Sequence, residues 1–100
     1  MPLTLFTYSF FDRSLQALGP EQKEITQRIL KALKVYYDSN CNLEKAQEIE
    51  SRFFYKQLRR PYYEAGVEGK IRVIIERDKS DCFAVLVGNH DQVKKFLAHQ

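Results

Sequence analysis

The side chains that could do chemistry in this chain of 100 residues are a histidine, several arginines and lysines, and adjacent tyrosines. His90 follows an apolar run that ends at Gly88, and an imidazole exchanges protons near neutral pH. Arg72 lies inside an earlier apolar run, where a guanidinium can grip a phosphate through two hydrogen bonds. Cleavage of a phosphodiester without metal needs a proton carrier and a cation of this kind. We therefore take His90 and Arg72 as candidate catalytic residues.

Five further residues are candidates for contacts with such a substrate: Lys70, Arg59, Arg60, Tyr62 and Tyr63. In an extended strand, alternation would place the lysine on the same face as Arg72. The two arginines directly precede the strand that carries the tyrosines. Aromatic rings on an open sheet can stack on nucleic-acid bases, and neighbouring cations can bind the backbone.

Each candidate also has a plainer interpretation, and the sequence leaves these open. The basic residues can form a solvated surface, and Arg72 can pair with Glu64 on a neighbouring strand. One of two adjacent strand tyrosines commonly lies in the core and the other on the surface. His90 can instead cap the last helix or form a hydrogen bond at its start.

Several kinds of chemistry have no signature in the sequence. Phosphate-binding and dinucleotide-binding glycine motifs are absent, as are a nucleophile elbow and a His-Glu-x-x-His pattern. Cys41 and Cys82 show no metal-ligand spacing, and we interpret them as reduced thiols, with a disulfide as the alternative. His99 is the second-to-last residue, so we expect no two-histidine zinc site. We expect neither a metal nor a cofactor.

Length and composition indicate one globular domain that spans residues 1–100. The net charge of +3 and the pI of about 8.9 are compatible with nucleic-acid binding without requiring it. No apolar run reaches about eighteen residues, so we expect no membrane span. The first residues lack the basic region and cleavage site of a signal peptide, which predicts a cytoplasmic protein.

Hydrophobic spacing predicts helices in the first half of the chain. Residues 3–8 alternate as a short strand, and residues 9–18 and 20–37 follow helical spacing on either side of Gly19-Pro20. This short break predicts a helical hairpin. Residues 43–58 fit a third helix, although the run from Phe53 to Tyr55 could instead begin a strand.

The second half of the chain changes to a period of two. Residues 62–67 and 70–77 flank Glu68-Gly69, which predicts a β-hairpin, and residues 82–87 form the next strand. Residues 91–98 predict a final short helix. Helices followed by strands indicate an α+β fold with an antiparallel β-sheet, covered by helices on one face and open on the other.

The order and spacing of three segments resemble the RelE/ParE superfamily of toxins from bacterial type II toxin–antitoxin pairs. The segments are an opening strand and helix at residues 8–18, a hairpin at residues 61–75, and a terminal Gly-Asn-His-Asp motif within residues 87–93. The resemblance implies a single RelE-like domain, in which the N-terminal helical hairpin packs on one face of an antiparallel sheet.

The resemblance also implies a function and partners. The protein would be a ribosome-dependent messenger-RNA endonuclease that inhibits translation through metal-independent attack of a 2′-hydroxyl on phosphate. Arg72 matches the family's strand arginine and His90 its general acid or base. A cognate antitoxin would neutralise the protein. The protein would form a homodimer or a toxin–antitoxin hetero-oligomer. Alternatives are a ParE-like gyrase inhibitor or a non-catalytic binding protein, because the strand at residues 83–87 carries no basic residue.

Overall fold

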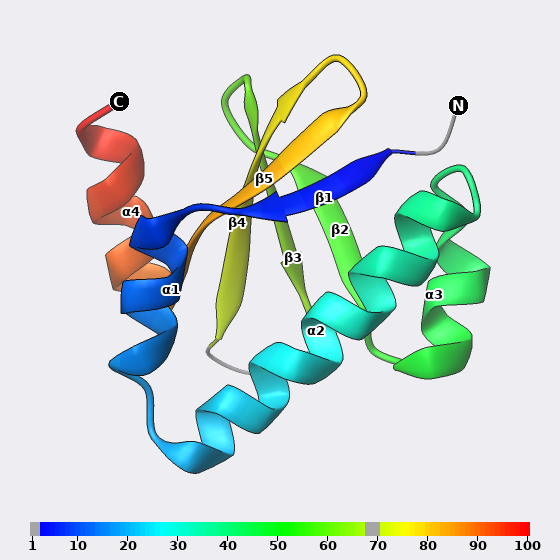
Figure 1. Ribbon diagram of the computed structural model, residues 1–100, viewed down its shortest axis with the longest axis horizontal. Coiled ribbons are helices and arrows are strands. Elements are labelled where there is room, and N and C mark those ends of the chain that lie inside the picture. Colours follow the sequence, from blue (N-terminus) through cyan, green and yellow to red (C-terminus); the bar gives the residue numbers. More distant parts are fainter. Residues whose placement is uncertain (1–2, 68–70) are drawn as a thin grey trace.

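The structure is a computed structural model that describes residues 3–67 and 71–100 (Figure 1). Its elements, in chain order, are β1 (Thr4–Thr7), α1 (Ser9–Gln16), α2 (Pro20–Asp38), α3 (Leu43–Ile49), β2 (Phe54–Gln57), β3 (Tyr62–Gly66), β4 (Arg72–Asp78), β5 (Asp81–Gly88) and α4 (His90–Ala98). The strands form one sheet in the order β1-β5-β4-β3-β2. No helix in the described ranges is long and apolar enough to cross a membrane.

The α+β class is confirmed, but the prediction of a purely antiparallel sheet is wrong. Strands β2 to β5 form an antiparallel meander, whereas β1 pairs with β5 in parallel. A parallel neighbour requires a long crossover connection. Here the connection from β1 to β5 runs through helices α1, α2 and α3 and then through strands β2, β3 and β4, before β5 pairs with β1 (Figure 1).

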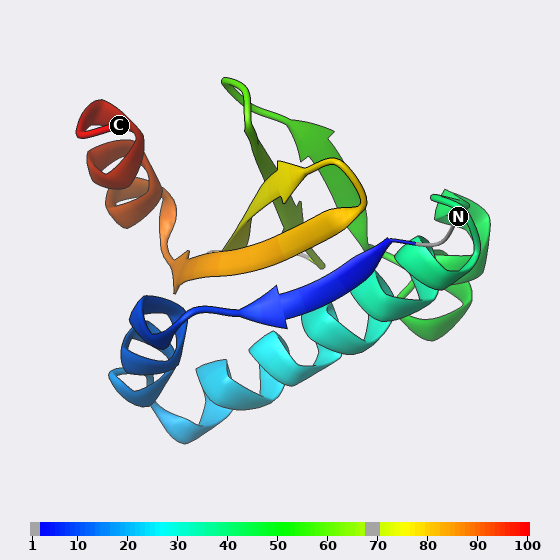
Figure 2. The ribbon, with the colours of Figure 1, turned by 45° about the horizontal axis from the view of Figure 1, so that its top comes forward.

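The prediction that the first two helices pack against each other as a hairpin is also wrong. Both helices form where the sequence predicts them, but they diverge from Gly19 and do not lie side by side (Figures 1 and 2). Helix α1 packs on β5, where Ser14 Oγ accepts a hydrogen bond from the Val87 N–H at 3.1 Å. Helix α2 runs across the sheet and buries Ile29 and Leu33. Each helix therefore covers a different part of the same face.

The predicted third helix ends early. Helix α3 stops at Ile49, and Phe54 and Tyr55 pair with Gly66 and Ala65 as strand β2. Aromatic side chains favour a strand when a neighbouring strand offers hydrogen bonds and packing, and this outweighs weak helical spacing. The alternative of a strand beginning near Phe53 is confirmed, within one residue.

The face of the sheet away from α1 and α2 is only partly open. Helix α4 lies over it and, with the strands beneath, forms a second small core: Tyr62, Ile74, Val85, Leu86 and Val93. The main core on the opposite face includes Val73 and Ile75, as alternation along β4 requires. The open part of the second face therefore lies beside α4, over β2, β3 and the start of β4.

A cluster of buried phenols joins α2 to the sheet. The hydroxyls of Tyr37 and Tyr55 form a hydrogen bond of 2.8 Å, and both rings pack against Tyr36. Burial raises the pKa of Tyr37 above its ordinary value of 10.0, and the adjacent Tyr55 raises it further. Burial also raises the pKa of Tyr55. Both phenols therefore stay protonated in the folded protein at pH values where an unfolded chain would release the protons.

This cluster predicts that the protein loses stability above about pH 10. Below that pH both states keep the phenolic protons, so their contribution to the free energy of unfolding is constant. Above it only the unfolded state releases them. Urea unfolding between pH 8 and 11 should show a decline that is shallower in Tyr37→Phe. The exposed Tyr8 is the control, and Tyr8→Phe should keep the wild-type slope; equal slopes in all three proteins would contradict the prediction.

Candidate functional site

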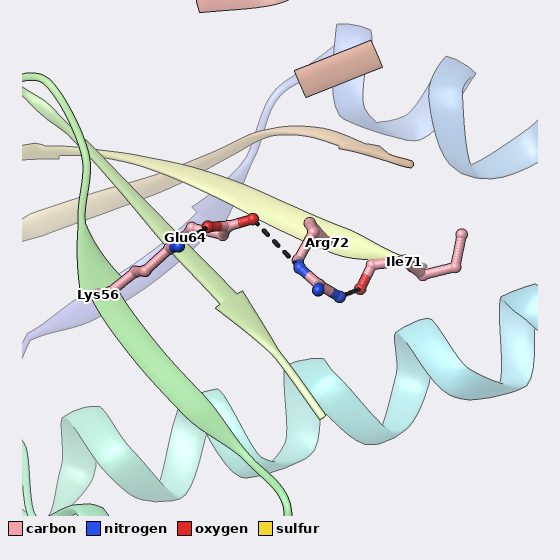
Figure 3. A network of polar contacts seen from close by, with 4 residues as sticks. All are labelled: Lys56, Glu64, Ile71 and Arg72. Carbon is pink, nitrogen blue, oxygen red and sulfur yellow. Dashed lines mark hydrogen bonds and ion pairs between the residues drawn. The ribbon is translucent and has the colours of Figure 1, made fainter. Parts of the chain in front are cut away.

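Arg72 is the first residue of β4 and lies on the face opposite α1 and α2. It shares this face with Glu64 of β3, because Glu64 pairs with Ile74 and side chains alternate along each strand. Arg72 Nε lies 3.2 Å from Glu64 Oε1, and Lys56 Nζ of β2 lies 3.3 Å from Glu64 Oε2 (Figure 3). One carboxylate on the middle strand thus joins two cations, one from each neighbouring strand.

The three side chains of this Lys56–Glu64–Arg72 network differ in exposure. The side chain of Glu64 is 6% exposed, that of Arg72 24% and that of Lys56 62%. A buried carboxylate requires compensating charge, and two cations supply it. With two positive charges and one negative, the network keeps a net charge of about +1 in a partly exposed position. Such a site can attract an anion.

The guanidinium of Arg72 is fixed by further contacts. Its Nη1 donates a hydrogen bond to the carbonyl of Ile71 at 3.1 Å (Figure 3). Its carbon Cζ lies 5.0 Å from the ring centre of Phe54, a cation–π contact. Gly66 makes room for that ring, since a Cβ at Gly66 would lie 2.7 Å from Phe54 Cε1. The plainer interpretation of Arg72, a pair with Glu64, is therefore confirmed, and the pair orients Arg72.

His90 begins α4 and is exposed. The cap of this helix is Asn89, whose side chain accepts a hydrogen bond from the Gln92 N–H at 2.9 Å, while Gln92 Oε1 accepts one from the Asn89 N–H. The interpretation of His90 as the helix cap is therefore wrong. Arg72 pairs with Gly88, two residues before His90. The two candidate catalytic residues thus lie at the same end of the sheet.

The other candidates do not form one surface. Arg59 Nη2 donates to the carbonyls of Leu97 and Gln100, and the Tyr62 hydroxyl donates to Gln100 Oε1. Both residues hold the C-terminal end of α4, and the ring of Tyr62 is buried against Phe96. The interpretation of one tyrosine as core and the other as surface is therefore confirmed for Tyr62 and wrong for Tyr63, which packs against the main core.

Three predicted substrate contacts lie elsewhere. Tyr63 faces the main core and stacks on Tyr55 at 5.5 Å. Arg60 is exposed in the loop before β3. Lys70 lies outside the described residues. Substrate contacts of these residues stay predictions.

Sequence reasoning missed Lys56 and Phe54 as members of the site. Both lie on β2, which the sequence had assigned to a helix, so their alternation with the residues of β3 was not considered. In the part of the chain that the structure describes, no group of three or more histidine, cysteine or acidic side chains could hold a metal ion.

The comparison with known proteins identifies the fold. No protein-family model matches the sequence, and no curated protein matches it. Among solved structures, the Escherichia coli DinJ-YafQ toxin–antitoxin complex aligns with a TM-score of 0.66 and 10% identity, over 93% of this chain and 98% of that chain. The RelB-RelE antitoxin–toxin complex of Methanococcus jannaschii aligns with a TM-score of 0.63 and 14% identity, over 91% and 96%.

A third similar structure is a metal-bound toxin from Helicobacter pylori, with a TM-score of 0.65 and 17% identity over 91% of this chain and 98% of that chain. In each comparison the alignment covers nearly the whole of this chain and nearly the whole of the chain aligned with it. The predicted resemblance is thus confirmed at the level of the fold, which this chain shares with these toxins.

Proposed function

We propose that this chain is the toxin of a type II toxin–antitoxin pair and that it cleaves messenger RNA on the ribosome in the cytoplasm. The observation that carries the proposal is the position of Arg72 and His90 at one end of a RelE-like sheet. Metal-independent cleavage of RNA requires proton transfer and stabilisation of charge on the phosphate, and an exposed imidazole and an oriented guanidinium can supply them.

In the proposed reaction the 2′-hydroxyl oxygen of a ribose attacks the adjacent phosphorus. The bond from phosphorus to the 5′-oxygen breaks, which leaves a 2′,3′-cyclic phosphate and a 5′-hydroxyl. His90 accepts the proton of the attacking hydroxyl or donates one to the leaving oxygen. Arg72 and Lys56 stabilise the charge that grows on the phosphate in the transition state. Arg60 and Lys70 contribute contacts to the RNA backbone.

The proposed partner is a cognate antitoxin that neutralises this activity. The support is the fold shared with the toxins of the DinJ-YafQ and RelB-RelE complexes. The proposal therefore includes a toxin–antitoxin hetero-oligomer, with a homodimer as the form without antitoxin.

Induced expression of the chain in bacteria without an antitoxin tests this function. We expect growth to stop and primer extension to detect new 5′ ends within translated messenger RNA. The same transcript with its start codon removed is the control, and it should stay intact because the activity depends on the ribosome. Normal growth with intact transcripts at high expression would overturn the proposal.

A second candidate function is binding without cleavage. The chain would then be a ParE-like inhibitor of DNA gyrase or a non-toxic protein that only binds a partner protein. One observation favours it: both cations of the network are already paired with Glu64. The same expression experiment separates the two candidates. Growth arrest with intact transcripts and an induced DNA-damage response would favour the gyrase inhibitor.

A further inference from the structure

The outer edge of β1 carries no strand of the described chain, because β1 is the first strand of the sheet (Figure 2). The N–H groups of Thr4 and Tyr8 donate toward β5, to the carbonyls of Ser80 at 2.9 Å and Ala84 at 3.1 Å. Backbone groups along a strand point alternately toward one neighbour and the other. The N–H and C=O groups of Leu5 and Thr7 therefore point outward, where a further strand could pair with them.

A groove of about 660 Å³ lies between this edge and α2. Its apolar lining includes Leu3, Leu5 and Leu30. Its polar lining includes Lys31 and Lys34, which are exposed on α2, with Gln27 before them and Asp38 at the far end of the helix. A chain lying along β1 would thus find apolar contacts and two cations on the side that faces α2.

The opposite side of the same edge is aromatic. Phe6 of β1 and Tyr8, which directly follows the strand, are 46% and 42% exposed. Both stack on Phe83 of β5, with ring centres 5.4 and 5.0 Å apart. An added strand sends alternate side chains to the two faces of a sheet. One set would cover these rings and the other would enter the groove.

We propose that the outer edge of β1 binds an extended segment of a partner protein in which apolar and acidic residues alternate. Backbone hydrogen bonds to Leu5 and Thr7 would supply affinity, and Lys31 and Lys34 would select acidic side chains. A second copy of β1 fits less well, because its residues, Thr4 to Thr7, include no acid. The edge is separated from Lys56 by the width of the sheet, so this inference does not depend on the proposed nuclease.

A labelled ten-residue peptide of alternating valine and glutamate is the probe, with a valine–lysine peptide as its control. Fluorescence anisotropy with the full chain should show binding of the first peptide and about tenfold weaker binding of the second, a difference of about 1.4 kcal/mol. The second peptide loses two surface ion pairs and places lysines beside Lys31 and Lys34. Amide exchange measured by NMR should slow at Leu5 and Thr7. Exchange at Thr4 and Phe6, whose N–H groups already face β5, should change little.

Two sets of variants complete the test. Thr7→Pro removes an outward N–H and places a ring where the added strand would lie, so it should abolish binding. The double variant Lys31→Glu, Lys34→Glu should reverse the preference between the peptides. The matched variant Lys94→Glu, Lys95→Glu on α4 should keep it. Absence of binding, equal binding of both peptides, or protection of Leu5 and Thr7 by a second copy of the chain without peptide would overturn the proposal.

Discussion

His90→Ala should lower the rate of messenger-RNA cleavage by about 10²–10⁴-fold, the usual contribution of a general acid or base. The variant should fold normally, because His90 is exposed and the cap of α4 is formed by Asn89 and Gln92. We expect a change in the free energy of unfolding within about 0.5 kcal/mol, as for most surface substitutions. Loss of activity would then be a chemical effect.

Cleavage of a translated transcript in a purified translation system measures this prediction. His99→Ala is the matched control, since His99 is also exposed but lies at the opposite end of α4, in the groove between α1 and α4. It should keep the wild-type rate. A wild-type rate in His90→Ala would remove His90 from the mechanism, and equal losses in both variants would indicate damage to α4.

The parts of the fold that the sequence predicted are those with a strong local pattern. Helix α2 has an apolar stripe at helical spacing, and β4 alternates apolar and charged residues; both appear within one or two residues of the prediction. The hairpin of β3 and β4 was predicted from its turn residues, Glu68-Gly69, which lie outside the described residues. Local pattern also placed His90 directly after the end of a strand, as the structure shows. It placed Arg72 in the middle of a strand, whereas Arg72 is the first residue of β4.

The parts that the sequence missed depend on contacts between distant segments. The parallel pairing of β1 with β5 joins residues about 80 positions apart, and nothing in either strand alone specifies its direction. Segment 43–58 has both helical spacing and aromatic residues, and only the pairing with β3 decides where the helix ends. Because the helix was preferred over the strand for this segment, Lys56 was missed as a partner of Glu64.

Arg72→Met should weaken both stability and cleavage. Methionine keeps much of the side-chain length, but Glu64 would remain buried with only Lys56 as a partner, and Lys56 is largely exposed. A buried carboxylate that loses a charged partner costs about 1–3 kcal/mol in free energy of unfolding. Loss of a cation at the phosphate should lower the rate of cleavage by about 10²–10³-fold.

The two effects can be separated by changing Glu64 as well. In the double variant Arg72→Met, Glu64→Gln the uncompensated charge is gone, so urea unfolding should show that much of the lost stability returns. Cleavage should stay low, because the guanidinium is still absent. Lys56→Met is the control for stability and should cost less than about 1 kcal/mol, since Lys56 is largely exposed and Glu64 keeps the less exposed Arg72 as its partner. If the double variant instead regained cleavage along with stability, Arg72 would serve only to hold Glu64, and binding without cleavage would become the better account of this site.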